Sequence, residues 1–441
     1  MSRIFVAAFW ADQLLLPIYS SWPRRAAPIV LGFRPFFAEL NYLRFFSDSN
    51  TLLNLVGRLN KKHQEDLMAT IEKVLIVGGG ISGLCLAIAL RERNIEVDIA
   101  EIKTEWTVYG VGIIQQSNVV RAMADLGIVD KYLAAAFPFE QPCIYAPDGS
   151  LAAKLPALRL AGPNYPANLG VSRLALHQVL TQEAQERNAR VHLGLTLKGL
   201  DQDEQEVSVT FSDGSVERYD LVVGADGVYS RVRMLLFGDR YTPRYTGQAV
   251  WRHNFPRPKE MDHLCAFPTP NGNAGLCPLS DDLMYMFVTS SEPGNPYHRE
   301  EDLPGLMRDR LKGYGGIIGE LRETIHDPKE IVYRPMEVLF VEEPWHKGRV
   351  VLIGDAAHAT TPHLAQGAGL AIEDAVVLAD ELNTKPTIEV ALQRFHERRY
   401  DRCKTICEGS IQVGEWELNH SPEADHKGML LKMITLAAQP I

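Results

Sequence analysis

Between residues 350 and 369 an acid, an imidazole and a glycine-rich helix start lie close together, and the helix start suits the binding of a negatively charged group. Asp355 comes two residues after Val350–Ile353, an apolar run typical of a parallel strand that is covered on both faces. Pro362 and His363 lie in the loop that follows, and Gly367–Gly369 precedes a helical pattern. Glycines let backbone N–H groups approach a ligand, and a helix N-terminus favours negative charge. The segment therefore predicts an anion site with a carboxylate and a histidine beside it.

A second glycine-rich turn predicts a dinucleotide site. The strand Lys73–Val77 leads into a segment with the spacing G-x-G-x-x-G, and a helical pattern and a second strand follow. In this context the first glycine permits the turn, the second lets the backbone approach a pyrophosphate, and the third lets the helix pack on the strand. The residues of this segment are Gly78, Gly80, Ile81, Ser82 and Gly83, and Glu101 ends the second strand, where it can accept a hydrogen bond from a ribose hydroxyl.

Two more charged residues lie where elements begin or end. Asp220–Gly227 has the pattern of a buried strand that ends in a glycine-rich turn, and Asp226 lies in this turn. Arg173 lies at the mouth of a helix that begins after Ser172, so its guanidinium is placed to reach a phosphate or a ribose. An ordinary surface salt bridge is the alternative for Arg173.

Composition and charge exclude several classes of function. The 441 residues are 46% hydrophobic and 23% charged, as in an ordinary globular protein, and the net charge is -10. There is no basic stripe of the kind that phosphate contacts require, so we expect no nucleic-acid partner. The six cysteines form no C-x-x-C pair and have no partners at zinc spacing. We therefore expect free thiols in the cytoplasm and no metal site.

Taken together, the three glycine-rich segments resemble those of the class A flavoprotein monooxygenases, the aromatic hydroxylases with the para-hydroxybenzoate hydroxylase fold. Gly78–Gly83 is similar to the FAD fingerprint of that family. Val223–Gly227, with Ser230 and Arg231, is similar to its D-G motif, and Gly354–His358 to its G-D motif. The run from Pro362 to Gly369 resembles the branch that contains the 6-hydroxynicotinate and salicylate hydroxylases.

The resemblance implies FAD as the cofactor and assigns residues to it. Asp355 would bind the ribityl or pyrophosphate part, and Glu101 the adenosine ribose. The backbone of Gly367, Ala368 and Gly369 would face flavin N1 and the C2 carbonyl. Pro362 would lie near the ring edge at which the C4a-hydroperoxide forms, Arg173 would contact FAD, and Asp226 would lie near the middle of the cofactor.

The resemblance also implies a reaction. NADH or NADPH and O2 would be co-substrates, and a small phenolic or N-heteroaromatic acid would be hydroxylated. His363 is a candidate base, although a loop histidine that only caps backbone groups is equally plausible. Arg252 and His253, on the strand Gly247–His253, are placed to bind a carboxylate or to form salt bridges. Alternatives are a same-fold oxidase or reductase, a hydroxylase of larger polyketide, quinone or isoprenoid substrates, and a non-catalytic flavin-binding protein.

The predicted fold is α/β, with a Rossmann-like FAD-binding domain, an inserted mainly-β substrate domain and C-terminal helices. We assign residues 68–140, 165–240 and 341–410 to the FAD-binding domain, 141–164 and 241–340 to the sheet domain, and 411–441 to a helical tail. Residues 1–67 do not resemble the rest, and a start assigned too early is favoured over a transit peptide or an anchor. We expect a monomer or homodimer without stable membrane association.

Overall fold

The computed structural model describes residues 71–441 except 107, 109, 270 and 271. The predicted extension at residues 1–67 therefore lies outside the described residues. The dinucleotide motif connects a strand of a six-stranded sheet to the helix that follows this strand. The sheet has the order β18-β19-β12-β1-β2-β8, and all neighbouring strands are parallel except β18 and β19. Its strands are β1 (Lys73–Val77), β2 (Glu96–Glu101), β8 (Arg190–Leu193), β12 (Leu221–Gly224), β18 (His346–Lys347) and β19 (Val350–Leu352).

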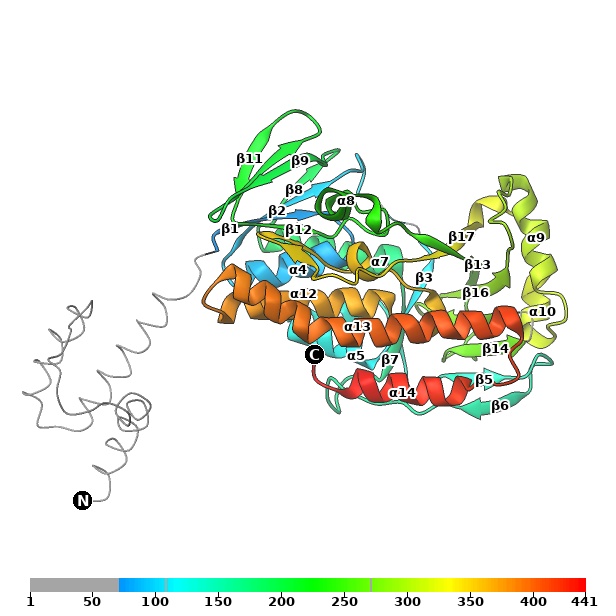
Figure 1. Cartoon of the computed structure of the whole chain (residues 1–441). Coiled ribbons are helices and arrows are strands. Elements are labelled where there is room, and N and C mark those ends of the chain that lie inside the picture. Colours follow the sequence, from blue (N-terminus) through cyan, green and yellow to red (C-terminus); the bar gives the residue numbers. More distant parts are fainter. Residues whose placement is uncertain (1–70, 107, 109, 270–271) are drawn as a thin grey trace, which may run out of the picture. The chain divides into compact units, whose positions relative to one another are not determined.

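Structure covers both faces of this sheet, which explains why its strands read as continuous apolar runs. On one side, helix α4 (Ile81–Arg91) packs against both α7 (Arg173–Glu186) and α12 (Gly367–Thr384) (Figure 1). An antiparallel meander lies on the other side and consists of β9 (Leu197–Gln202), β10 (Val207–Phe211) and β11 (Val216–Tyr219). Helix α8 (Arg231–Phe237) follows β12, and α5 (Ser117–Asp125) and α6 (Val129–Ala134) follow β3.

A second, seven-stranded sheet has the order β17-β13-β16-β15-β14-β5-β6. One of its faces packs against α9 (Leu303–Arg310) and α10 (Gly316–Arg322), and Trp251, Met286 and Ile318 are fully buried there. The strands are β5 (Cys143–Tyr145), β6 (Leu151–Lys154), β13 (Arg244–Pro256), β14 (Cys265–Thr269), β15 (Gly272–Pro278), β16 (Leu283–Ser291) and β17 (Ile331–Val338).

The opposite, inner face of this sheet packs on a small sheet made of β3 (Gly112–Gln115), β7 (Asn168–Ser172) and β4 (Phe137–Phe139). The approach is close: a Cβ added at Gly112 would lie 2.0 Å from the Tyr285 ring, and one at Gly170 would lie 2.0 Å from the Pro278 carbonyl oxygen. Two glycines therefore let the sheets meet, and the inner face is held toward the dinucleotide-binding part.

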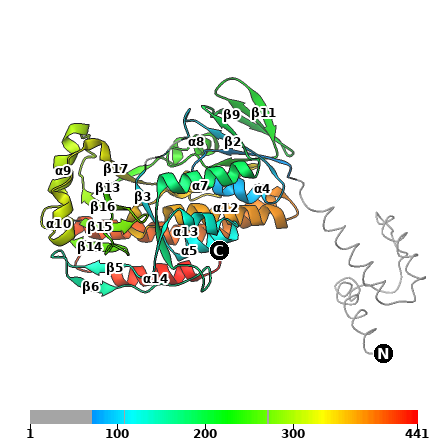
Figure 2. The same cartoon turned by 180° about the vertical axis from the view of Figure 1, so that it is seen from behind.

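Helix α13 (Ile388–Asn419) packs on α12 and also on β13, so it connects the two sheets, and α14 (His426–Ala438) packs on α13 and α5 (Figures 1 and 2). The predicted fold class is confirmed. Within the described part of the chain, none of the helices combines the length and the apolar character that crossing a membrane would need. The remaining short elements are α11 (Asp355–His358) and the 3-10 turns η2 (Gly238–Arg240), η3 (Glu300–Asp302), η4 (Pro328–Glu330) and η5 (Pro362–Leu364).

Candidate active site

The glycine-rich turn has the shape of a phosphate-binding loop. Gly78 has a φ of 109°, and a Cβ at this residue would lie 2.4 Å from the Ala225 carbonyl oxygen. A Cβ at Gly83 would lie 2.0 Å from the Gly78 carbonyl oxygen, so the helix and the strand pack too closely for a side chain. Gly80 is different, because nothing lies within 4 Å of its added Cβ. The backbone thus borders open space at the N-terminus of α4, where no side chain caps the helix.

Glu101 lies against this loop from the end of β2. It is 9% exposed, and its carboxylate accepts hydrogen bonds from the Gly79 N–H at 2.8 Å and the Lys103 N–H at 2.9 Å. Sequence reasoning did not find two further contacts of the loop: the Trp106 indole N–H, at 2.9 Å, and His177 Nε2, at 3.1 Å, both meet the Gly79 carbonyl oxygen. Because a carbonyl only accepts, His177 carries a proton on Nε2.

Asp355 at the start of α11 and Arg173 at the start of α7 lie close enough for their charges to interact. Asp355 begins α11 and is exposed to solvent. The protein around it still limits the hydration of its carboxylate, and this desolvation raises the pKa of Asp355, while the charges of His358 and Arg173 act in the opposite direction. Burial also lowers the pKa of Arg173, against the effects of Tyr285 and Asp355, and its Nε has no hydrogen-bond partner among the described residues. Both side chains are therefore available to a polar ligand.

Asp226 is engaged differently. Its carboxylate accepts hydrogen bonds from the Ser230 hydroxyl and from the backbone N–H groups of Arg231, at 2.7 Å, and Val232, at 3.1 Å. Burial raises its pKa and these hydrogen bonds oppose the increase. The carboxylate thus holds the start of α8, and a direct contact of Asp226 with the cofactor stays a prediction.

The start of α12 is held in place by buried polar side chains. Gly367, Ala368 and Gly369 are its first residues, and Gln366 precedes them without capping the helix. Asn118 on α5 donates to Gln366 Oε1 at 3.0 Å and to Glu373 Oε1 at 3.0 Å. The first N–H groups of an 18-residue helix are therefore left for a ligand with negative charge.

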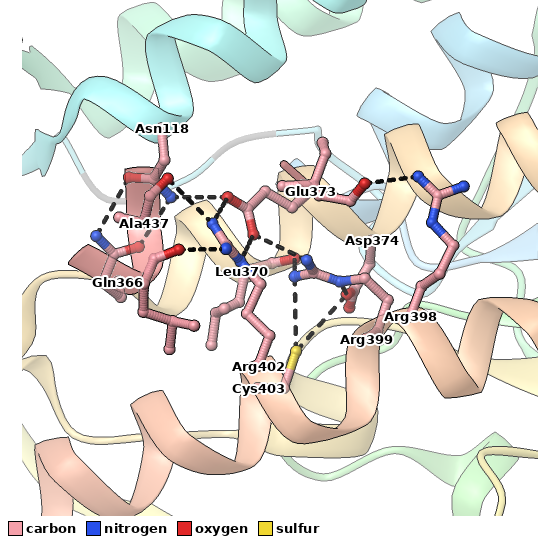
Figure 3. A network of polar contacts seen from close by, with 12 residues as sticks. Asn118, Gln366, Leu370, Glu373, Asp374, Arg398, Arg399, Arg402, Cys403 and Ala437 are labelled. Carbon is pink, nitrogen blue, oxygen red and sulfur yellow. Dashed lines mark hydrogen bonds and ion pairs between the residues drawn. The ribbon is translucent and has the colours of Figure 1, made fainter. Parts of the chain in front are cut away.

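Glu373 is the centre of the polar network shown in Figure 3. It is fully buried. Its Oε2 atom accepts a hydrogen bond from Arg399 at 2.9 Å, and each of its two carboxylate oxygens accepts one from Arg402 at 2.8 Å. Both arginines lie on α13, whereas Glu373 lies on α12. The network consequently fixes α12, and the helix start that it carries, to α13.

Asp374 joins this network to the G-D turn. It accepts hydrogen bonds from Arg399 Nε at 2.8 Å, from the Gly354 N–H at 2.9 Å and from His358 Nε2 at 2.7 Å. His358, Asp374 and Cys403 bring three possible metal ligands within 4.8 Å of one another. The Arg399 guanidinium, however, already contacts both Asp374 and Cys403, at 2.8 and 3.6 Å, so this cluster is better described as part of the charge network.

On the sheet side, strand alternation separates the two residues predicted to bind a carboxylate. His253 is 3% exposed and lies on the outer face, where Nε2 is 3.2 Å from Glu330. Arg252 lies on the inner face, together with Tyr285 on the paired strand β16. Burial and the neighbouring Arg173 lower the pKa of Arg252 to about 10, Tyr285 opposes this, and Arg252 makes no ion pair with any described residue. Arg252, not His253, is available to an anionic ligand.

Pro362 and His363 form the short turn η5, which packs on α13. The His363 side chain is 2% exposed, and its Nε2 is 3.3 Å from Glu417 Oε2. Neither ring nitrogen has a hydrogen bond of good geometry with a described residue. The structure therefore turns the imidazole toward α13, and its partner there is a glutamate that the sequence patterns did not reveal.

Known proteins match the chain over most of its length. The model of the FAD binding domain family matches residues 72–409. The 2-heptyl-3-hydroxy-4(1H)-quinolone synthase of Pseudomonas aeruginosa is 33% identical over 78% of the chain and 90% of its own length. The 3-hydroxybenzoate 6-hydroxylase of Polaromonas naphthalenivorans is 30% identical over 77% of the chain and 87% of its length. The chain is a class A flavoprotein monooxygenase.

A solved structure supports the same fold. Klebsiella pneumoniae HpxO, in complex with FAD and uric acid, superposes with a TM-score of 0.73 over 84% of the chain and 97% of its own length, at 24% identity. The chain described here has features that suit the binding of FAD. They are the open space beside Gly80, the Arg173 Nε without a partner among the described residues, the exposed Asp355 carboxylate and the uncapped start of α12. The individual contacts assigned to Gly78, Ile81, Ser82, Gly83, Glu101 and Asp226 stay predictions.

Proposed function

We propose that this monooxygenase takes electrons from NADH or NADPH and hydroxylates a small phenolic or N-heteroaromatic acid. The observation that carries this proposal is the environment of Arg252, a largely buried guanidinium without an acidic partner among the described residues. Charges of this kind are usually paired, because burying an isolated charge is costly. A substrate with a carboxylate, or with an acidic hydroxyl or ring N–H, would supply the missing anion.

The bound FAD would supply the activation of O2, and the protein residues would bind and orient the ring. Arg252 is placed to pair with the anionic group of the substrate, and the Tyr285 hydroxyl on the same face is placed to donate a hydrogen bond to it. Electrophilic attack requires an electron-rich ring, and removing a phenolic or ring N–H proton increases the electron density. His363, beside Pro362, is our candidate for the group that receives this proton.

The activities named for the two relatives fit this substrate class. One is named for making a hydroxylated quinolone, an N-heteroaromatic ring, and the other for hydroxylating a hydroxybenzoate. The quinolone relative favours a second candidate, a hydroxylase of a larger substituted heteroaromatic ring. The six cysteines are all free and buried, which fits our expectation that the protein works in a reducing compartment such as the cytoplasm.

The test is to screen hydroxybenzoates, hydroxypyridine carboxylates and hydroxyquinolines for a shift of the flavin absorbance of the holoenzyme. Those that bind are then assayed for NADH and NADPH oxidation. The proposal expects one hydroxylated product per nicotinamide oxidised. If only quinolone-sized rings are hydroxylated, the second candidate replaces the first. If no aromatic compound stimulates nicotinamide oxidation, the proposal is wrong.

A further inference from the structure

A polar pocket opens at the end of the seven-stranded sheet, where β13 and β16 meet the last turn of α13. Its volume is about 640 Å³, and none of the residues assigned to FAD borders it. Gln248, Thr289 and Glu417 form its inner wall. Since these residues lie on the side of the sheet that carries Arg252, the pocket is next to the proposed active site and not within it.

The Glu417 carboxylate joins this pocket to His363. Its Oε2 atom accepts hydrogen bonds from the Thr289 hydroxyl at 3.1 Å and from Gln248 Nε2 at 3.3 Å, and it lies 3.3 Å from His363 Nε2. The Glu417 side chain is 12% exposed and that of His363 is 2% exposed. One end of the pair is therefore in contact with solvent, and the other is buried behind it.

The wall between the pocket and His363 is closely packed. Gly414 packs against it so tightly that an added Cβ would lie 2.6 Å from Gln248 Oε1 and 2.8 Å from His363 Cε1. A flavin monooxygenase has to exclude water from the reacting oxygen, yet protons must enter and leave the closed site. A histidine and a carboxylate in contact can transfer protons without opening such a wall.

We propose that His363 and Glu417 form a proton path between the substrate site and this pocket, an inference that rests on the proposed function. The substrate O–H bond breaks as an N–H bond forms on His363. The Nε2–H then passes its proton to Glu417 Oε2, and Glu417 releases it to water in the pocket. In the reverse direction the path delivers the one proton that the overall reaction consumes, in which NADH, H⁺, O2 and the aromatic substrate give NAD⁺, the hydroxylated product and water. Glu417 acts through His363 and is a positioning residue.

Other titratable groups near the pair are already engaged or lie farther along the pocket. Arg310 is 2.9 Å from Glu292, and Lys312 is 2.8 Å from Asp309. Tyr314 and His420 line the pocket as well, while Gly414, which packs on His363, and Gln248, which bonds to Glu417, carry no charge. A change in pH dependence on replacing Glu417 would therefore report on the pair of His363 and Glu417 itself.

The test uses the oxidised holoenzyme and 4-nitrophenol, whose phenolate absorbs visibly. The two are mixed in a stopped-flow instrument at a pH where free 4-nitrophenol is protonated, and the appearance of bound phenolate is followed in H2O and D2O. Glu417→Gln preserves the shape and the acceptor for Thr289 but cannot carry the proton. We expect Glu417→Gln to slow the ionisation of the bound phenol on the order of 10-fold and to change the pH dependence of its rate. His363→Ala should slow ionisation further, by roughly 10²-fold, because it removes the group that receives the proton directly. Glu415→Gln, at an exposed residue of the same helix, is the matched control.

Each outcome decides between the claims. Slower ionisation in Glu417→Gln with normal FAD content, and recovery when formate is added to Glu417→Ala, would support the path. Equal rates in Glu417→Gln and Glu415→Gln, or a bound probe that stays protonated, would overturn it. If 4-nitrophenol and the screened aromatic acids all fail to perturb the flavin, the proposed function and the path fail together. If aromatic acids are hydroxylated normally in Glu417→Gln, only the path is wrong.

Discussion

Arg252 and Arg173 come from different parts of the fold and lie close enough for their charges to repel each other, and no described carboxylate pairs with Arg252. Arg252 comes from β13 of the seven-stranded sheet, and Arg173 from the start of α7 beside the dinucleotide-binding sheet. Burial lowers the pKa of Arg252, and the charge of Arg173 lowers it further, to about 10. Arg252 is thus still charged at neutral pH, and its charge is costly until an anion arrives. Removing the Arg252 guanidinium should therefore weaken the binding of an anionic substrate and raise the stability of the substrate-free protein.

Arg252→Gln should weaken the binding of an aromatic carboxylate by about 10- to 100-fold, because a hydrogen bond to a charged group contributes about 1.5–3 kcal/mol. The same change should raise the melting temperature of the substrate-free holoenzyme, since an unpaired buried charge disappears. Flavin absorbance titrations and calorimetry measure the two effects. Arg244→Gln, at the exposed start of the same strand, is the control and should change neither. Unchanged affinity in Arg252→Gln would remove Arg252 from the substrate site.

Asp355 and Asp226 offer a paired test of cofactor binding. Asp355→Ala removes an exposed carboxylate close to Arg173, and we expect FAD affinity to fall by roughly 10-fold or more. Asp226→Ala removes the acceptor for two backbone N–H groups of α8, so it should lower the stability by about 0.5–2 kcal/mol, as the loss of a helix cap does. FAD fluorescence titration and thermal unfolding separate the two effects. A fully flavinated Asp355→Ala protein would contradict the role of Asp355.

The dinucleotide part could be predicted because its chemistry is local. The glycines of the first turn, the apolar runs of β1, β12 and β19 and the start of α12 are all encoded within short segments, and their backbone requirements are specific. The pairing of Glu373 and Asp374 with Arg399 and Arg402 joins residues 25 to 29 apart on two helices. No short pattern marks such pairs, because they depend on how α12 and α13 pack.

The substrate side was harder for a different reason. Alternation along Gly247–His253 already implies that Arg252 and His253 point to opposite faces, but the sequence does not say which face meets the flavin. Tyr285 could have been found by the same alternation once the register between β13 and β16 was known. Glu417 gave no signal at all, because its contact with His363 depends on the length and direction of α13.

His363→Ala should lower the turnover of a phenolic substrate and raise the fraction of NADH oxidised with release of H2O2, because the ring would be less often ionised when oxygen is activated. Simultaneous measurement of NADH, O2 and H2O2 gives this coupling ratio. His326→Ala, at an exposed residue of the sheet domain, controls for the loss of a histidine. Normal coupling and normal turnover in His363→Ala would leave His363 as a packing residue of η5.

The buried charge network predicts a specific loss of stability in acid. Burial alone would raise the pKa of Asp374, but His358 and Arg399 outweigh it and hold the pKa at about 2, below its ordinary value of 3.8. A carboxyl whose folded pKa is lowered stabilises the protein above its unfolded pKa, so this contribution is lost as the pH falls from about 4 toward 2. Asp374→Asn should therefore lower the free energy of unfolding by on the order of 3–5 kcal/mol at pH 7, because Arg399 loses a buried partner, and the variant should lack this part of the acid dependence.

Urea unfolding between pH 7 and pH 3 measures both the loss of stability and its pH dependence. Asp380→Asn is the control, since its half-exposed pair with Arg398 is worth about 0–1 kcal/mol. Equal stability losses in the two variants would show that the network in Figure 3 does not hold α12 on α13.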